Sequence, residues 1–384
     1  MQNTKVKLIA GLLGLYLVAV GISYAVFSYI IKPAKKSVTP QNVAQTRSKI
    51  DPSAPKDQEC PISGEKFTQA ERDIWEKRRP LMIMIENHQE ARPQSGLSSA
   101  DVVYEAIAEG GISRFMGVFY CGVASEEVQV GPVRSARTYF LDWASEYGDH
   151  PLYAHVGGAN KPGPADALGQ INNYGWFLYN DLNQFSMGFP TYWRDYERLG
   201  RTVATEHTMY STTDKLLAVA ADRGLLAQDK NGTDWNKGYT AWKFTDGQSS
   251  TSPTAAKISF SFWEGYQDYN VSWIYDTATN TYKRENGSQP HMDLDNNQQL
   301  SASNVVIQFT PLKGPIDELK HMLYKTIGTG RALVFQNGNV TQASWSKKSR
   351  TDRTIFLDKA GKQITFVRGP IWIEEVDPIT KVTY

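Results

Sequence analysis

Cysteine is nearly absent from this chain of 384 residues, which contains only Cys60 and Cys121. The chain has no C-x-x-C pair and no spacing of cysteine and histidine typical of zinc, so the sequence offers neither a dithiol redox motif nor a zinc site. We expect no metal and no cofactor. In an oxidising compartment the two cysteines could form one disulfide, and the alternative is two free, buried thiols.

A charge excess is absent as well, because the formal net charge is +1. Five lysines and no acidic residue fall within residues 1–37, which leaves 36 basic and 40 acidic residues, or −4, for the rest. Phosphate backbones attract proteins with a basic face, so we expect no nucleic-acid partner. Any site for an anion must therefore be local.

Familiar catalytic motifs are also missing: the chain has no HExxH, no P-loop and no nucleophile elbow. The sequence therefore leaves open whether the protein is an enzyme.

The hydrophobic run at residues 8–31 spans 24 residues without a charge and has lysines on both sides. That length suffices to cross a bilayer, so residues 1–31 are predicted to be a transmembrane signal anchor that keeps the folded region outside the cytoplasm, at a cell membrane. A cleaved signal peptide, ending at "SYA" before Val26, is the alternative. Residues 32–58 are rich in Lys, Pro, Ser and Gln and predict a flexible stalk.

Residues 60–250 alternate between strand and helix patterns. Strands are expected at 81–86, 112–121 and 152–158, and helices at 98–109 and 131–148, which gives a βαβαβ order with some parallel pairing. A further helix is expected at 211–224 because Ser and Thr precede its apolar positions and Gly224 follows them. This region is predicted to be an α/β domain.

Residues 255–384 are predicted to form a smaller, mostly β domain, so that the fold class is α+β overall. Residues 271–285 read as a hairpin, and Asn337-Gly338 stands between two strand-like runs, the strongest short hairpin signal. Three short strands are expected within 353–377, and one short helix near 315–325.

Polar residues gather where the strands of the α/β domain are expected to end. If those strands are parallel, their carboxyl ends meet at one sheet edge, where ligands bind in open α/β sheets. Arg134 and Arg137 lie three residues apart near a predicted helix start, which suits an anion, although internal pairing with Glu86, Asp101, Glu105 or Glu109 is the alternative. The predicted ligand-binding residues are Asn87, Arg92, Gln94, Arg134, Arg137 and His155.

Glu105 and Glu109 stand four apart at the end of the first predicted helix, where like charges repel. Arg114 is the nearest cation in the sequence, so these residues could form a structural clasp. Together with Glu86, they could instead supply a general acid and base.

Several long motifs resemble the YerB-like family, bacterial envelope lipoproteins of uncharacterised function. They are "ENHQEARPQSGLSSADVVYEAIAEGGISRFMGVF" and "GPVRSARTYF", followed by "EHTMYST", "VSWIYDTATNTYKRENG" and "GRALVFQNG". The resemblance implies two family-specific domains, an extracytoplasmic location with membrane attachment, and no established catalytic activity. The family pattern falls on Asn87, Arg92, Pro93, Gln94, Gly96, Asp101, Glu105, Glu109, Arg114, Arg134, Ser135 and Arg137.

This sequence departs from the lipoprotein members in one respect, because no cysteine for lipid attachment precedes Cys60. The expected contact with the bacterial membrane is therefore the hydrophobic run at 8–31. The leading hypothesis is an anchored envelope protein that binds an anionic ligand or a protein partner through an arginine-lined cleft. The alternatives are a hydrolase or lyase that acts on an envelope polymer with paired carboxylates, and a structural scaffold.

Overall fold

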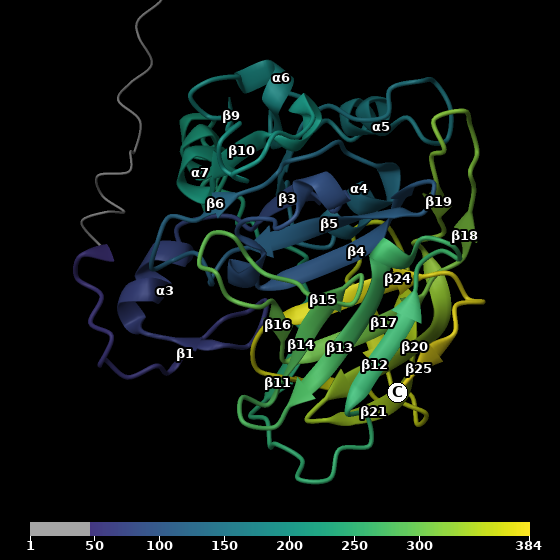
Figure 1. Ribbon diagram of the computed structural model, residues 1–384. Coiled ribbons are helices and arrows are strands. Elements are labelled where there is room, and N and C mark those ends of the chain that lie inside the picture. The colour runs from purple at the N-terminus through teal and green to yellow at the C-terminus, as the bar shows by residue number, and fades with distance from the viewer. Residues whose placement is uncertain (1–46) are drawn as a thin grey trace, which may run out of the picture. The chain divides into compact units, whose positions relative to one another are not determined.

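One long sheet organises the part of the chain that the computed structural model describes, residues 47–384, and strands from both ends of that range contribute to it (Figure 1). The predicted anchor and most of the predicted stalk lie outside the described residues. Within residues 47–384 the helices all lack the length and hydrophobicity of a membrane span. The order of the ten strands in this sheet is β22 (Ile355–Leu357), β21 (Asn339–Lys347), β20 (Gly328–Gln336), β17 (Asn304–Phe309), β24 (Ile371–Val376), β4 (Val102–Glu109), β5 (Ile112–Phe119), β3 (Leu81–Glu86), β7 (Leu152–His155) and β8 (Asp181–Asn183).

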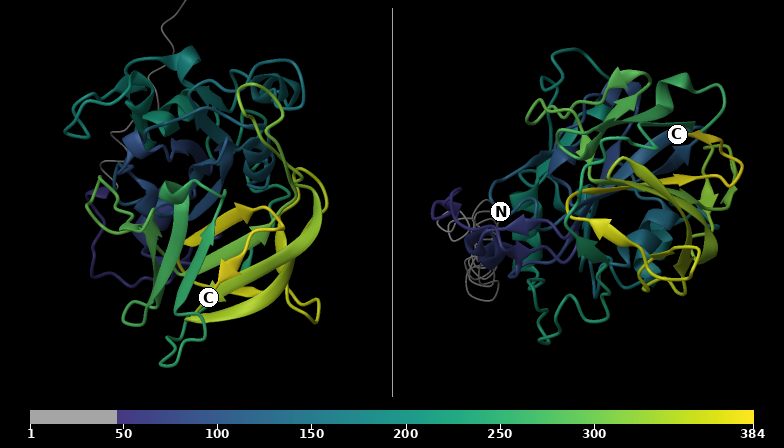
Figure 2. Two further views of the ribbon diagram at one scale, coloured as in Figure 1. Left: turned by 45° about the vertical axis from the view of Figure 1, so that its right-hand side comes forward. Right: turned by 90° about the horizontal axis from the view of Figure 1, so that it is seen from below.

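A second sheet faces the C-terminal half of the first. Trp273 of the second sheet packs against Trp372 of β24 with ring centroids 5.2 Å apart, and Tyr282 packs against Phe335 of β20 at 6.5 Å. Seen from below, these strands curve around a shared core (Figure 2). The strands of the second sheet are β15 (Gln289–Pro290), β14 (Thr281–Asn286), β13 (Asn270–Asp276), β12 (Lys257–Ser261) and β25 (Val382–Thr383), and β16 (Ser301–Ala302) pairs with β14.

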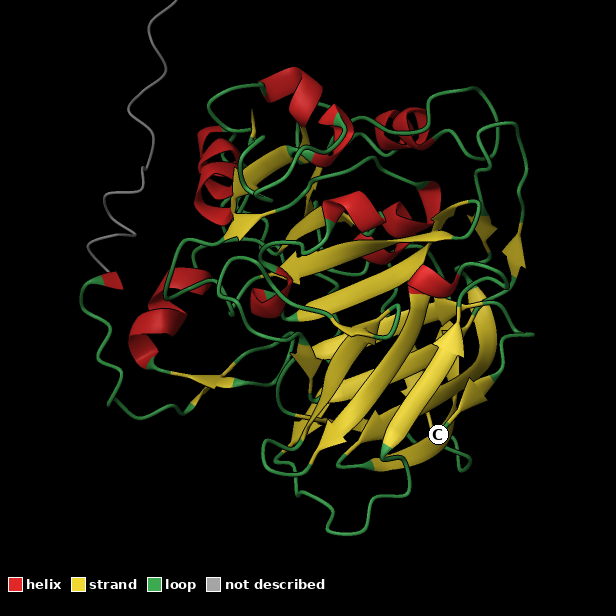
Figure 3. Ribbon diagram, in the orientation of Figure 1, coloured by secondary structure: helices red, strands yellow, loops and turns green. Residues whose placement is uncertain are grey.

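Helices are short and gather mainly around the N-terminal half of the long sheet, whereas the C-terminal half consists of strands (Figure 3). The helix α7 lies where the sequence predicts it, and the side chain of Thr212 accepts a hydrogen bond from the backbone N–H of Lys215 at its start. The helices are α3 (Gln69–Trp75), α4 (Thr138–Ala144), α5 (Ala167–Asn173), α6 (Gln184–Met187) and α7 (Thr213–Asp222).

Four small sheets complete the described structure. The three-stranded one holds β10 (Met209–Thr212) between β6 (Gln129–Val130) and β9 (Trp193–Arg194). The others are two-stranded: β1 (Gln58–Glu59) with β2 (Lys66–Phe67), β11 (Lys243–Thr245) with β23 (Thr365–Val367), and β18 (Leu312–Lys313) with β19 (Leu323–Tyr324).

The predicted βαβαβ order is wrong because residues 102–109 form the strand β4 and not a helix. This strand lies between β24 and β5, and residues 102–108 are all buried. A strand that is covered on both faces is apolar at nearly every position, so its sequence also fits a buried helix. Gly110 and Gly111, with φ of 48° and 94°, make the tight turn into β5 and do not end a helix.

The strands near the predicted sheet edge are not all parallel. The strand β3 pairs with β7 in parallel but with β5 antiparallel, so the carboxyl end of β5 points the other way. The helix expected at 131–148 is shorter than predicted and consists of α4 alone. The short helix expected near 315–325 is absent, because this segment forms a turn and then enters β19 at Leu323. The strands expected at 81–86 and 112–121, and both predicted hairpins, are confirmed.

Candidate functional site

The segment from Gly131 to Arg137 is extended and runs along the ends of two strands of the long sheet. Its backbone N–H groups donate to neighbouring chain segments: that of Arg134 to Met84 O at 2.9 Å and that of Ala136 to Gly157 O at 2.9 Å. These bonds replace the ones that a helix would make within itself. Gly131 has φ of 149°, and a Cβ there would lie 2.7 Å from the ring of Tyr210, so only glycine fits this passage.

Arg134 is oriented by a carboxylate and faces a groove. Its Nε donates to Glu86 Oε1 at 3.0 Å, and its side chain is 26% exposed. Neither Nη atom has a hydrogen-bond partner within residues 47–384. The groove that Arg134 lines has a volume of about 520 Å³ and is open to solvent. A guanidinium held at Nε presents its outer edge, with both Nη groups, to a ligand.

The other walls of this groove, which we call the Arg134 groove, combine polar side chains with the apolar Val156, Leu168 and Met209. Arg194 reaches it from β9, while Asn160 and Asn183 come from the segments that follow β7 and end β8. Phe185 at the start of α6 is 76% exposed at the rim. The groove thus combines two guanidinium groups and two amides with one exposed aromatic ring.

One carboxylate, that of Glu206, also lines the Arg134 groove. Its own backbone N–H, followed by smaller contributions from His207 and Arg134, lowers the pKa of the Glu206 side chain. The site therefore carries both signs of charge and suits a ligand that offers an anion beside hydrogen-bond donors.

Glu86 connects Arg134 to a histidine pair below the groove. Its Oε2 lies 2.8 Å from His207 Nδ1, and the ring of His88 stacks on His207 with centroids 4.6 Å apart. Burial lowers the pKa of His207, but the hydrogen bond and charge of Glu86 outweigh it, so that this pKa is raised. For His88, burial and then the neighbouring His207 lower the pKa. One carboxylate, that of Glu86, therefore bonds to both Arg134 and His207.

Arg137 is buried and bound internally. Together with Arg114 it holds the carboxylate of Glu109; Arg114 Nη2 lies 3.1 Å from Glu109 Oε2. Burial would raise the pKa of Glu109, but Arg114 and Arg137 lower it to about 2. Burial, followed by the charge of Arg114, lowers the pKa of Arg137. This group is a compact charge cluster between β4, β5 and the start of α4.

Asn87, Arg92 and Gln94 meet in a buried network with the C-terminal half. The Oδ1 atom of Asn87 accepts hydrogen bonds from Gln94 and Arg92 at 3.1 Å each and from Asn286 at 2.8 Å. Gln94 Oε1 lies 2.6 Å from His291 Nε2. Burial lowers the pKa of the Arg92 guanidinium to about 10. These three predicted residues bond to one another and join the two halves, and they do not line the Arg134 groove.

Glu105 belongs to the same buried network. Its carboxylate accepts hydrogen bonds from Ser113 Oγ at 2.6 Å and from Arg284 Nη2 at 2.6 Å. Burial, followed by the charge of Glu105, raises the pKa of the neighbouring Glu374 well above its usual range. The side chains of Glu105, Glu374 and Arg284 are fully buried, so the two carboxylates of Glu105 and Glu374 face no open cleft.

His155 supports the Arg134 groove from beneath. Its ring is fully buried, with Nε2 2.5 Å from Asp181 Oδ1 and Nδ1 2.6 Å from the carbonyl oxygen of Gly157. Gly157 lines the groove, whereas the ring of His155 does not. His155 therefore holds the groove wall in place and does not contact its contents.

Cys60 and Cys121 form a disulfide, with sulfur atoms 2.11 Å apart. Beside it, the carboxylate of Asp101 accepts hydrogen bonds from the backbone N–H groups of Tyr120 and Cys121 at 2.7 and 3.0 Å. Burial raises the pKa of Asp101 to about 7, against the lowering effect of these bonds. Within residues 47–384, these three residues form the one cluster with spacing suitable for a metal, and both of its sulfurs are already joined.

Reasoning from the sequence missed most of the Arg134 groove. Asn160, Asn183, Phe185 and Arg194 lie in loops and short elements that carry no pattern of their own. Glu206 is the one exception, because it is the first residue of the motif "EHTMYST", from which a functional role could have been predicted. Of the six predicted ligand-binding residues, Arg134 lines the groove and the other five do not.

The fold and the site together define a β-rich, disulfide-bonded protein whose two halves share one sheet and which presents an open, arginine-containing groove. Two sequence families match consecutive parts of this chain: "Protein of unknown function (DUF3048) N-terminal domain" over residues 64–226 and "Protein of unknown function (DUF3048) C-terminal domain" over residues 258–373.

A curated relative is "Putative lipoprotein YerB" of Bacillus subtilis (strain 168), 27% identical over 338 residues, which are 85% of this chain and 88% of the relative. The crystal structure of the YerB protein from Bacillus subtilis superposes with a TM-score of 0.68 at 25% identity, over 85% of this chain and all of that one. The chain therefore belongs to the YerB-like family with its two DUF3048 domains.

Proposed function

We propose that this protein is an extracytoplasmic component of the bacterial cell envelope that binds an anionic ligand in the Arg134 groove. The location is supported by the relative named as a lipoprotein and by the disulfide, which is typical of an oxidising compartment. We further propose that residues 8–31 attach this chain to the membrane, because these 24 uncharged residues are enough to span a bilayer.

One observation carries the binding proposal: Arg134 is held by Glu86 through Nε while both Nη atoms remain available at an open groove. Charge-assisted bonds from a guanidinium edge are strong and often bidentate with carboxylates and phosphates. Arg194 provides a second cation in the same groove; its Nη1 is occupied by the carbonyl oxygen of Thr205, and its Nη2 has no partner within residues 47–384.

The remaining groups favour a carboxylate ligand that also carries amide or hydroxyl groups. Asn183 Oδ1 accepts hydrogen bonds from the N–H groups of Gly157 and Phe185, so its Nδ2 is the atom left to donate. Glu206 can accept from an N–H or O–H of the ligand, and the exposed ring of Phe185 offers an apolar face. A peptide or acidic sugar fragment of an envelope polymer combines these features.

The binding proposal can be tested by thermal unfolding of the full-length protein in a nonionic detergent. The probes are N-acetylmuramic acid, an acyl-D-alanyl-D-alanine peptide and glycerol 3-phosphate. A probe present at 100 times its dissociation constant stabilises the folded state by about 2.7 kcal/mol. We expect at least one carboxylate probe to raise the melting temperature of the native protein and to leave that of Arg134→Gln unchanged.

The matched control is Arg72→Gln, which removes the same charge from an exposed pair on α3 and should respond like the native protein. If no probe shifts the native protein, or if Arg134→Gln shifts as much as the control, the groove is not the site. If Arg134→Gln also loses several kcal/mol of stability, the pair with Glu86 is structural, as the scaffold hypothesis requires.

A further inference from the structure

A second groove opens where the two sheets of the C-terminal half separate. Leu333 and Phe335 of β20 face the inside of this double layer, because Tyr282 from the opposite sheet packs on Phe335. Arg331 lies on the same face as Leu333, since it is two residues away on the strand. The opposite sheet ends at β25, which pairs with β12 only at Ser259 and Phe260.

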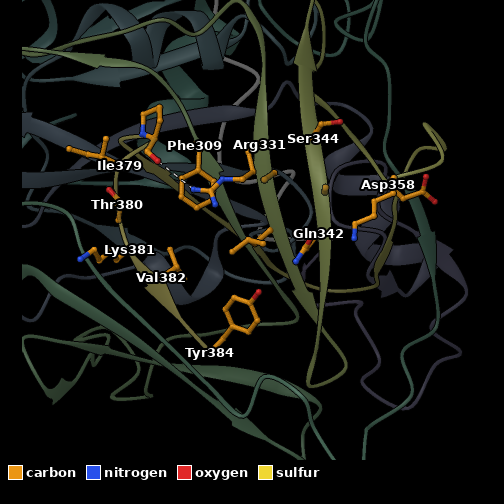
Figure 4. Close-up of a pocket in the computed structure, with 15 residues that line it drawn as sticks. Phe309, Arg331, Gln342, Ser344, Asp358, Ile379, Thr380, Lys381, Val382 and Tyr384 are labelled. Carbon is orange, nitrogen blue, oxygen red and sulfur yellow. Dashed lines mark hydrogen bonds between the residues drawn. The ribbon is translucent and has the colours of Figure 1, made fainter.

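Beyond β25 the inner face of the β20–β21 hairpin is uncovered. Arg331 pairs with Ser344 and Leu333 with Gln342, and both of these partners on β21 are exposed. The hollow between this hairpin and residues 378–384 has a volume of about 730 Å³. Figure 4 shows Thr380 and Lys381 of the C-terminal segment across from Arg331 and Gln342. We call this hollow the seam groove.

Three cations from three different elements line the seam groove: Arg331 on β20, Lys359 in the turn after β22, and Lys381 before β25. All three are exposed, and none has an ion pair within residues 47–384. The groove contains one side-chain carboxylate, that of Asp358. Its Oδ1 accepts hydrogen bonds from the backbone N–H groups of Ala360 and Lys362, at 2.9 Å each.

Two other arginines at the surface are each paired with a carboxylate: Arg134 with Glu86 and Arg368 with Glu59. The seam groove thus holds three cations beside one side-chain carboxylate, in a chain whose folded region is slightly acidic.

Arg331 is fixed in place. Its guanidinium carbon lies 3.6 Å from the centre of the Phe309 ring, and its Nη2 donates to Pro378 O at 3.4 Å (Figure 4). Stacking on a ring orients the guanidinium without neutralising its charge. The remaining polar side chains of the groove are uncharged, namely those of Gln342, Ser344, Thr380 and Tyr384.

We propose that the seam groove binds an anionic polymer with hydroxyl groups along its repeat, through Arg331, Lys359 and Lys381. Cations on separate walls favour a chain with charges at intervals over a single compact anion, and the hydroxyl and amide groups between them can bond to the polymer backbone. A phosphodiester polymer and a uronate glycan share this chemistry. The proposal concerns a surface separate from the Arg134 groove and does not depend on it.

The test is calorimetric titration of the full-length protein in a nonionic detergent with three probes: poly(glycerol phosphate), polygalacturonate oligomers and neutral dextran oligomers. We expect saturable binding of one or both anionic polymers and none of dextran. Because exposed charges are screened by salt, affinity should fall steeply between about 0.05 M and about 0.5 M salt. The polymer that binds more tightly shows whether the ligand's negative charges are phosphates or carboxylates.

The informative variant is Lys359→Gln with Lys381→Gln, which changes exposed residues and should leave folding intact. Two lost exposed ion pairs predict a roughly tenfold weaker affinity. The matched control is Lys348→Gln with Lys362→Gln, which removes two exposed lysines outside the groove. The proposal is overturned if neither anionic polymer binds saturably, if dextran binds equally well, or if the control pair weakens binding as much as the groove pair.

To distinguish the two grooves, each variant is also tested with the probes of the other groove. Arg134→Gln should leave polymer binding unchanged, and the lysine double variant should leave the response to small carboxylates unchanged. Failure of one proposal therefore does not decide the other.

Discussion

Several buried charges in this protein are paired with opposite charges, and each pair can be tested one residue at a time. Glu109 is the clearest case because two arginines with side chains only 5% and 6% exposed converge on its carboxylate. Removing one partner of a buried ion pair leaves the remaining charge without compensation, which costs about 3 to 5 kcal/mol. Arg114 and Arg137 therefore depend on Glu109 for their stability in the folded state.

We predict that Glu109→Gln lowers the free energy of unfolding by about 3 kcal/mol, measured by urea denaturation at neutral pH. The folded-state pKa of Glu109, about 2, is below its ordinary value of 4.5. A lowered acid pKa stabilises the folded state above the ordinary pKa, and this contribution is lost as pH falls through the folded pKa. The native protein should therefore lose stability between about pH 4.5 and about pH 2 more steeply than the variant.

Glu76→Gln serves as the control, because this glutamate forms an exposed pair with Arg72 on α3. Its loss should cost less than about 1 kcal/mol. Equal losses in both variants would mean that the Glu109 cluster is not a stabilising unit.

For single residues, the sequence named Glu86 and Glu109 among the possible partners of Arg134 and Arg137, and Arg114 as a partner of Glu109, but not which side chain stays accessible. Glu86, Glu109, Arg134 and Arg137 all take part in charge pairs, yet only Arg134 reaches a groove. Which side chain remains accessible depends on long-range packing that spacing along the chain does not encode.

The most informative element is β4, whose sequence fits a helix and whose structure is a strand. Its residues are buried on both faces, so the alternation that would reveal a strand is missing. The two glycines that follow fit a helix end as well as a hairpin turn. Local patterns were sufficient where one face is exposed, as in β13, in which buried and less buried residues alternate.

The turn after β4 provides a test of whether residues 102–109 form a strand or a helix. In the hairpin, Gly111 has φ of 94° and a Cβ there would lie 2.9 Å from the Tyr266 ring, so Gly111→Ala should lower the free energy of unfolding by at least about 1 kcal/mol. Gly110→Asn should cost much less, because asparagine tolerates a left-handed backbone and Asn-Gly favours this turn. Urea denaturation of both variants measures the difference.

If residues 98–109 were a helix, Gly111→Ala would no longer be the more destabilising of the two variants. Gly111 would lie beyond the helix end, and replacement by alanine would be nearly neutral. A stable Gly111→Ala protein would therefore contradict the hairpin.

For the whole molecule, the two halves of the sequence are joined through the centre of one sheet. The strand β24 lies between β17, which is 67 positions earlier in the sequence, and β4, which is 269 positions earlier, and both pairings are parallel. Contacts at such separation leave no trace in hydrophobic periodicity, so a single sequence predicts the strands but not which strand lies beside which. The two matched family domains contribute to the same sheet.

Because of this shared sheet, the described region should unfold in one step, and Arg284 should be critical for it. Its fully buried guanidinium extends from β14 to Glu105 on β4 and lies 5.0 Å from the Trp372 ring. Arg284→Met keeps the apolar contact but leaves Glu105 without its cation, at a cost of about 3 to 5 kcal/mol. Glu105→Gln added to Arg284→Met should recover part of this loss, because no buried anion then remains.

Hydrogen exchange of strands β4 and β17 in the native protein and in both variants measures this coupling. Since exchange from core strands reports global unfolding, we expect the opening free energies of β4 and β17 to fall together in Arg284→Met. Loss of protection confined to the second sheet, with β4 unchanged, would instead show that the two halves unfold independently. A shared transition would mean that a ligand bound at either groove stabilises the entire folded region, since binding to the folded state alone raises its free energy of unfolding.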